Sequence, residues 1–227
     1  YLTSIGLNLG SDYNASAGHL TTNYRFTVPT KNPEHVETVI KIIADISNKL
    51  TLEPEAFERE RKIVEEEWRK QYGNNKRYFE EIKQYLYKNS IFLNRDPIGK
   101  IDVIQNFKYQ DVIDYYQKWY QPELMSVFVI GDIDTDNIEN LIKKYFKDIK
   151  NTPVKLPDYK IPNYNENQFF TFQDDEQTNI SFSIFEKNKF NKIDTFKNYK
   201  EAVINNLIGD IFKRRISESI EKKEVKF

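Results

Sequence analysis

The sequence predicts an α+β fold in which helices pack on one face of a mixed sheet. Two observations indicate strands: residues alternate in character along Thr22–Val28, and Ser126–Ile130 is a short, continuous apolar run. A third observation indicates helices, because apolar residues recur at helical spacing in most of the segments between them. Mixed strands and helix pairs of this kind suggest helices layered on a sheet.

The first half of the chain alternates between strand and helix patterns. Thr22–Val28 puts its aromatic and branched side chains on one face, as half-buried strands do. A helix start follows at Asn32, where a capping side chain precedes a proline and an acid. Further helical patterns run to Leu50, from about Phe57 past Trp68, and from about Tyr78 to Tyr87, and a turn follows at 94–99.

The sequence of the second half predicts three helices, three strands and a linker. The strands are Ser126–Ile130, Gln168–Phe172 and Thr178–Phe185, and the helices before the last two strands are Gln110–Trp119 and one capped by Asp134 or Thr135. A last helix is expected from about Thr195 to Arg215. Residues 151–163 hold three prolines and indicate an extended linker. We therefore expect one domain over 1–150 and the beginning of a second domain of the same type over 164–227.

Composition excludes several classes of function. The 34 basic and 35 acidic residues nearly cancel, so charge gives no argument for a nucleic-acid partner. The chain has no cysteine, which removes thiolate catalysis, disulfides and Cys-ligated zinc. No apolar run approaches the roughly 20 residues that a membrane span needs. With 227 residues the chain can still bury a full core.

The charged helix around Val64 carries two acids at unexpected positions. Residues seven apart on a helix lie within about 20° of one another. Phe57, Val64 and Trp68 therefore form an apolar stripe. Glu60 and Glu67 are predicted to fall inside that stripe, one turn on either side of Val64. Two acids on an apolar face require a partner or a function.

Two explanations of these acids are open from the residues alone. Glutamate is rarely buried unless it is paired, and Arg59, Arg61 or Arg77 could supply the partner of a structural ion pair. The alternative is a metal ligand with a helping carboxylate, since Zn²⁺ accepts glutamate oxygen and neighbouring acids orient the ligands.

Four stretches, in order, resemble one family. They are Gly10–Tyr24 with its Asn-Ala strand, Arg59–Glu67 with its Arg-Glu…Glu helix, the Asp96–Gly99 turn, and Tyr120–Asp132 with its Tyr-x-Pro…Gly-Asp pattern. Together they resemble the pitrilysin/insulinase family of zinc peptidases, the inverzincins, and especially its bacterial zinc-protease branch. The resemblance implies a metallohydrolase-type peptidase domain with a mainly antiparallel sheet. It covers about 1–150 well and 164–227 more loosely.

The resemblance also implies roles for particular residues. Glu67 matches the family's third zinc ligand, and Glu60 matches an outer carboxylate near the site. Asn14–Ala17 (Asn14, Ala15, Ser16 and Ala17) matches the edge strand on which the family binds extended peptide as an added strand. A second half of the protein closes a chamber around the peptide in the family, so a missing segment, a second half or a partner subunit is expected.

The chain departs from the family in one respect. The family's other two ligands and its general base come from a helical His-x-x-Glu-His motif, and this chain has only His19 and His35, neither in such a motif. His19 is expected to be a turn residue and His35 a solvated one. Catalytic zinc normally takes three protein ligands, so no tightly bound zinc and no peptidase activity are expected of this chain alone.

Two functions follow from the resemblance. The first is part of a zinc endopeptidase that cleaves extended peptides. The second is a non-catalytic peptide-binding or structural partner subunit of the same fold. Two buried acids on the inner face of the helix would favour the enzyme, because a lapsed site has no reason to keep them.

The ends of the sequence and the family resemblance suggest a larger, exported protein. The sequence starts at Tyr1 without methionine and ends in EKKEVKF, and both ends are interpreted as cuts through a larger protein. Bacterial members of this branch are often exported, so a periplasmic or cell-envelope location is expected, with the cytoplasm as the alternative.

Overall fold

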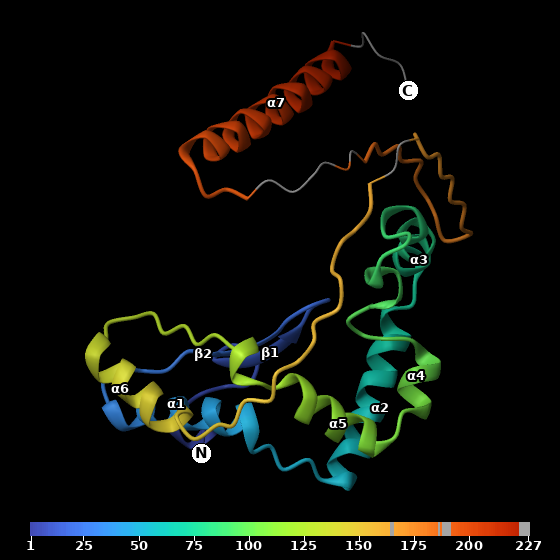
Figure 1. Ribbon diagram of the computed structural model, residues 1–227. Helices are drawn as coiled ribbons and strands as arrows, with labels where there is room; N and C mark the ends of the chain where they lie inside the picture. The colour runs from blue at the N-terminus through green and yellow to red at the C-terminus, as the bar shows by residue number, and fades with distance from the viewer. Residues whose placement is uncertain (164–165, 186, 188–191, 223–227) are drawn as a thin grey trace. The chain divides into compact units, whose positions relative to one another are not determined.

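The computed structural model describes residues 1–163, 166–185, 187 and 192–222. The chain divides into two compact units, one of residues 1–162 with 166–179, the other of 163–165 with 180–227. Figure 1 traces both units, and each is described by itself. The candidate site lies in the first unit.

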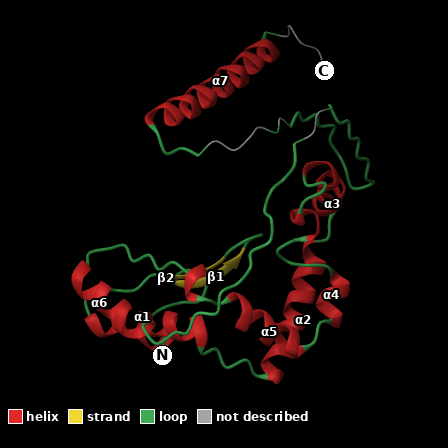
Figure 2. Cartoon of the chain, viewed as in Figure 1, coloured by secondary structure: helices red, strands yellow, loops and turns green. Residues whose placement is uncertain are grey.

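The first unit begins with a short 3-10 helix, η1 (Thr3–Ile5), and a β-hairpin. Strand β1 (Tyr13–Ala17) pairs antiparallel with β2 (Thr22–Phe26), and Tyr13 lies opposite Phe26. These two are the strands drawn in yellow in Figure 2. The strand predicted at Thr22–Val28 is confirmed and ends two residues early.

Helices α1 (Pro33–Asn48) and α6 (Thr135–Phe146) pack against each other. Asn32 caps α1 by accepting a hydrogen bond from the Glu34 N–H, as the sequence predicts. Asp134 caps α6 in the same way. Their contact holds much of the core, which includes Val39, Ile40, Ala44 and Ile138.

Helices α2 to α5 form the rest of the first unit (Figure 1). Helix α2 (Pro54–Gln71) packs on the short α4 (Ile101–Asn106), and α3 (Asn74–Leu86) follows α2 directly. The 3-10 helix η2 (Ile91–Asn94) precedes the predicted turn. Helix α5 (Tyr109–Trp119) ends before η3 (Pro122–Leu124), where the sequence predicts a stop.

Three predicted strands do not form within the described residues. Ser126–Ile130, Gln168–Phe172 and Thr178–Phe185 have no regular structure, and the described residues contain a single two-stranded sheet. The physical reason is that a strand requires a neighbour for its backbone groups, and none of the described residues provides one. Phe128 and Ile130 remain 84% and 95% exposed. The α+β class is confirmed, with a smaller sheet than expected.

The second unit contains the long helix α7 (Phe196–Glu221), which Thr195 caps through the Asn198 N–H. The helix predicted to Arg215 therefore continues for six further residues. Most of its apolar side chains are exposed, among them Phe196, Leu207, Ile208, Ile211 and Phe212. No helix among the described residues is long and apolar enough to cross a bilayer.

Candidate functional site

Arg61 anchors the packed face of α2. Its guanidinium lies over the Phe57 and Phe107 rings, 4.7 and 4.2 Å from their centroids. It also donates to the backbone carbonyls of Ile104 and Phe107, each at 2.5 Å. These carbonyls belong to the last turn and C-cap of α4, which a cation stabilises. Arg61 therefore ties α4 to α2 and fixes which side of α2 faces inward.

Glu60 and Glu67 do not lie on the face of α2 that α4 covers, and neither acid is buried. Both side chains are exposed; that of Glu60 is 63% exposed and lies 3.9 Å from Arg59. At about 100° per residue, Glu60 is rotated by about 60° from Phe57 on the helix. Helix α4 packs over Phe57 and Arg61. Glu60 is rotated away from this contact, and Glu67, seven residues later, lies on nearly the same side as Glu60. Both acids are therefore exposed to solvent.

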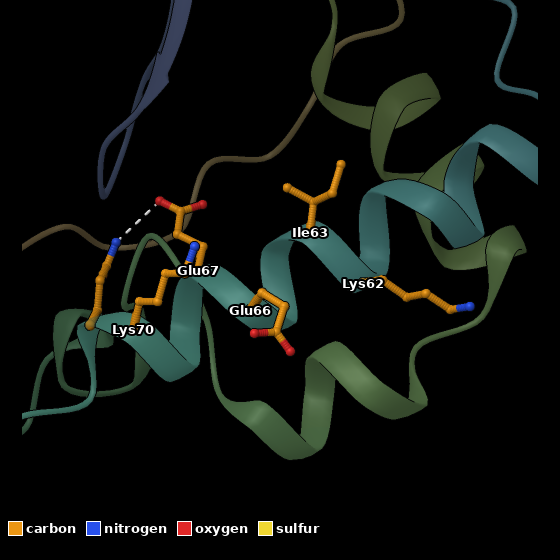
Figure 3. A pocket seen from close by; sticks show the side chains of 6 residues that line it. Lys62, Ile63, Glu66, Glu67 and Lys70 are labelled. Carbon is orange, nitrogen blue, oxygen red and sulfur yellow. Dashed lines mark hydrogen bonds between the residues drawn. The ribbon is translucent and has the colours of Figure 1, made fainter.

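Glu67 lies over an open hollow at the C-terminal part of α2. Its Oε1 accepts a hydrogen bond of 3.1 Å from the Gln71 amide. In Figure 3, Glu67 and Ile63 project from one side of the helix, while Glu66 and Lys62 project from the other. The hollow has a volume of about 600 Å³ and is lined by Lys62, Ile63, Glu66, Glu67, Lys70 and Gln71. Glu67 thus faces an open hollow on the surface of α2.

Arg77, one of the arginines that could have paired with the candidate acids, pairs with neither of them. Its guanidinium holds Asp174 through two hydrogen bonds of 2.6 and 2.8 Å and Glu176 through one of 2.8 Å. Tyr78 meets the rings of Phe170 and Phe172 beside this cluster. The segment 168–177 is therefore clamped onto α3, and Arg77 is a structural ion-pair residue.

This clamp is expected to weaken in acid. Arg77 is the main cause that lowers the pKa of Asp174 to about 2, against about 3.9 in an unfolded chain. A carboxyl whose pKa is depressed by folding stabilises the fold above about pH 4, and that contribution is lost as pH falls towards 2. The carbon-13 shift of the Asp174 carboxyl should titrate near 2, while Tyr78 ring shifts report release of the segment.

Asp174→Asn is the control for the acid titration. In this variant, the Tyr78 ring shifts should change between pH 4 and 2 by no more than the ring shifts of Tyr109, which lies elsewhere in the unit. An Asp174 carboxyl that titrates near 4 in the folded chain would contradict the clamp.

The outer side of β1 is an open strand edge. Thr27 donates to the Asp12 carbonyl and Gly18 to that of Thr21, so in the alternating ladder Asn14 and Ser16 face β2. Ala15 and Ala17 then direct their N–H and C=O groups away from the hairpin. Within the described residues β1 pairs only with β2, apart from a bridge between Tyr13 and Leu9.

The side chain of Asn14 covers part of this edge. Its Oδ1 accepts a hydrogen bond of 2.8 Å from the Ala15 N–H, the central outward donor. The predicted strand Asn14–Ala17 thus exists and is exposed. Its role in binding peptide remains a prediction.

The two histidines lie apart from both acids. His19, in the turn after β1, contacts the Arg95 carbonyl through Nδ1, and its ring meets Phe92 edge to face at 5.9 Å. It is a turn residue, as expected, that docks the hairpin on η2. His35, in the first turn of α1, is half-buried, not solvated as expected, and its Nδ1 is buried without a hydrogen-bond partner.

A tyrosine cluster was not predicted from the sequence. The hydroxyls of Tyr24 on β2 and Tyr120 after α5 lie 2.5 Å apart. Burial, together with the hydrogen bond to Tyr24, raises the pKa of the Tyr120 hydroxyl. Each tyrosine has a signal in the sequence: Tyr24 is on the aromatic face of a predicted strand, and Tyr120 belongs to the Tyr-x-Pro motif. Their contact could not be predicted, because the two residues are 96 positions apart.

A catalytic zinc site normally requires three protein ligands. Among the described residues, no three His, Cys, Asp or Glu side chains gather closely enough to hold a metal ion. The Glu67 carboxylate is exposed and accepts a hydrogen bond from the Gln71 amide, so it is accessible to a metal ion. The residues that the structure describes therefore do not form a complete zinc site by themselves.

Comparison with known proteins decides the family. The model of the insulinase family, peptidase family M16, matches residues 2–93, and that of the peptidase M16 inactive domain matches residues 106–224. The chain belongs to the M16 peptidase family. The family inferred from the four motifs is thereby confirmed.

The M16 chain is similar to proteins named as zinc proteases. It is 28% identical over 222 residues to the probable zinc protease PqqL of Haemophilus influenzae, which covers 96% of the chain and 24% of that protein. It is 29% identical over 230 residues to a zinc protease PQQL-like of Arabidopsis thaliana, covering 100% of the chain and 24% of that protein. The chain thus spans about a quarter of the length of these relatives.

Two solved structures resemble the M16 chain. The first half of the periplasmic protease PqqL from Escherichia coli is 30% identical, with a TM-score of 0.68 over 72% of this chain and 35% of that one. A variant of the ferredoxin protease FusC, solved with Arabidopsis ferredoxin, is 29% identical, with a TM-score of 0.66 over 71% of this chain and 18% of that one. The matched part of the chain therefore has the fold of part of an M16 peptidase half.

Proposed function

We propose that this chain is part of a zinc endopeptidase that cleaves extended peptides, with β1 as the strand edge that binds the peptide. The observation that carries the proposal is the open edge of β1 in a chain whose M16 relatives are named zinc proteases. In this proposal Glu67 is the chain's zinc ligand and Glu60 an outer carboxylate. The exposure of Glu67 supports the first role, since a ligand carboxylate must be reachable.

In this proposal, the remaining zinc ligands and the general base are supplied from outside the present chain. Neither histidine lies in a His-x-x-Glu-His motif, so the two further ligands and the general base come from another segment or subunit. We propose residues 1–150 as a peptidase domain, 151–163 as a linker and 164–227 as the start of a similar domain. We further propose a periplasmic location, supported by the description of the E. coli relative as a periplasmic protease.

The backbone of β1 defines how a peptide is bound. An added strand pairs with the outward N–H and C=O groups of Ala15 and Ala17, which gives affinity with little dependence on peptide sequence. The Asn14 side chain, which now occupies the Ala15 N–H, rotates away as the peptide pairs. Main-chain pairing of this kind suits unfolded or extended segments as substrates.

Ala15→Pro tests the proposed edge. Proline removes the central outward N–H of the edge. The hydrogen bonds between β1 and β2 stay intact, because the Ala15 backbone does not bond to β2. Proline is tolerated on such strand edges. Binding of fluorescein-labelled, carboxymethylated insulin B chain, an unfolded peptide, should weaken at least about tenfold. Fluorescence anisotropy on the whole chain measures the affinity.

Ser16→Ala is the matched control, because the backbone of Ser16 faces β2. It should bind the B chain as tightly as the unaltered chain does. Equal affinity of Ala15→Pro and Ser16→Ala would contradict peptide binding on this edge.

A further inference from the structure

The outward edge of β1 is positioned by contacts on the other strand of the hairpin. Ala15 lies directly opposite Tyr24 and Ala17 opposite Thr22. Both are non-hydrogen-bonded pairs, in which opposite Cα atoms approach to about 4.5 Å and side chains share one face. A shift of Tyr24 or Thr22 is therefore expected to displace the backbone of Ala15 or Ala17, the residue paired with it.

A single side chain, Tyr120, holds Tyr24 on β2. The Tyr120 hydroxyl lies 2.5 Å from that of Tyr24, and the rings meet at a centroid distance of 6.5 Å. The Thr22 side chain lies close enough to the Tyr120 hydroxyl to lower its pKa slightly, against the larger effect of burial. Tyr120 thus contacts the cross-strand neighbour of Ala15 and lies near that of Ala17.

Tyr120 is itself tied to the helical body. Its ring packs on that of Tyr116 at a centroid distance of 4.6 Å. The Tyr116 hydroxyl donates to the Ile46 carbonyl at 2.7 Å and accepts from the Leu50 N–H at 3.2 Å. Ile46 is in α1, whose inner residues are buried. A continuous chain of contacts therefore runs from the edge of β1 to the core.

We propose that Tyr24 and Tyr120 are positioning residues that fix the peptide-binding edge of β1 relative to α1 and α5. The inference rests on the proposed function for the choice of ligand. The pair leaves the outer edge of β1 uncovered, because it acts from the β2 side. Neither tyrosine contacts the peptide; both act through Ala15 and Ala17.

The test is a double-mutant cycle with Tyr24→Phe, Tyr120→Phe and the double variant, each in the whole chain. Each single variant removes one hydroxyl and keeps the ring contact. We expect affinity for labelled insulin B chain to fall about threefold to tenfold in each. The double variant should lose no more than either single one, since the two hydroxyls act as a unit.

Tyr115→Phe is the matched control, because Tyr115 is on α5, five residues before Tyr120, and is 59% exposed. It should leave affinity unchanged. Affinity is measured well below the melting temperature, so a general loss of stability would not change it. Unaltered affinity in Tyr24→Phe or Tyr120→Phe, or additive losses in the double variant, would overturn the proposal.

Amide hydrogen exchange separates this inference from the proposed function. The Asn14 and Ser16 amides, which face β2, should exchange faster in both single variants, while Val39 and Ile40 amides in α1 should not change. If the unaltered chain binds no peptide, the proposed function fails, and exchange alone decides the positioning role. Unchanged exchange at Asn14 and Ser16 would overturn it.

Discussion

Arg61→Met is expected to lower the free energy of unfolding of the first unit by about 3 kcal/mol. The Arg61 side chain is 12% exposed and donates to two backbone carbonyls at the end of α4. Methionine keeps the apolar stem but leaves both carbonyls without that donor and removes the cation from between the Phe57 and Phe107 rings. Urea denaturation followed by tryptophan fluorescence measures the change, because Trp68 and Trp119 both lie in this unit.

Arg59→Met on the same helix is the control for Arg61→Met. Its side chain is 69% exposed and approaches only Glu60, so the free energy of unfolding should change by no more than about 0.5 kcal/mol. Equal effects of the two substitutions would show that Arg61 does not hold α4 to α2.

Helix starts could be predicted from the sequence because they depend on neighbouring residues. Asn32, Asp134 and Thr195 each cap the helix that the sequence placed after them. Strands depend on distant partners, so the apolar run Ser126–Ile130 could not reveal that no described strand lies beside it. Local chemistry sets the first kind of element, and long-range pairing sets the second.

The candidate site was only partly predictable for a related reason. The heptad relation of Glu60 and Glu67 places them on one side of α2, which the structure retains. Which side faces inward depends on where α4 packs, and Arg61 decides that through contacts with residues more than 40 positions away. The pattern of one helix therefore gave the alignment of the acids and could not give their burial.

The exposure of both acids removes one argument for the enzyme. Buried acids would have needed a function to explain them, whereas exposed acids on a helix are ordinary. The case for catalysis now depends on the M16 relatives and on the open edge of β1. A direct test at Glu67 therefore carries more weight than its position on the helix.

Glu67→Gln is expected to weaken zinc binding about 100-fold or more once the family's other ligands are supplied. They can be supplied by fusing before Tyr1 the segment of an M16 relative that carries His-x-x-Glu-His. Glutamine keeps the size of the side chain and loses the anionic oxygen that Zn²⁺ prefers. Competition with a chromophoric chelator measures zinc affinity, and cleavage of insulin B chain should fall in parallel.

Glu66→Gln is the matched control for Glu67→Gln, one position along the same helix. Glu66 pairs with Arg69 on the surface, and Figure 3 shows it projecting away from the side that carries Glu67. Its substitution should leave zinc affinity and cleavage within about twofold of the unaltered fusion. The present chain without the added segment should show no chelator-sensitive cleavage. A Glu67→Gln fusion with normal zinc affinity and turnover would remove Glu67 from the site and leave it a surface acid bonded to Gln71.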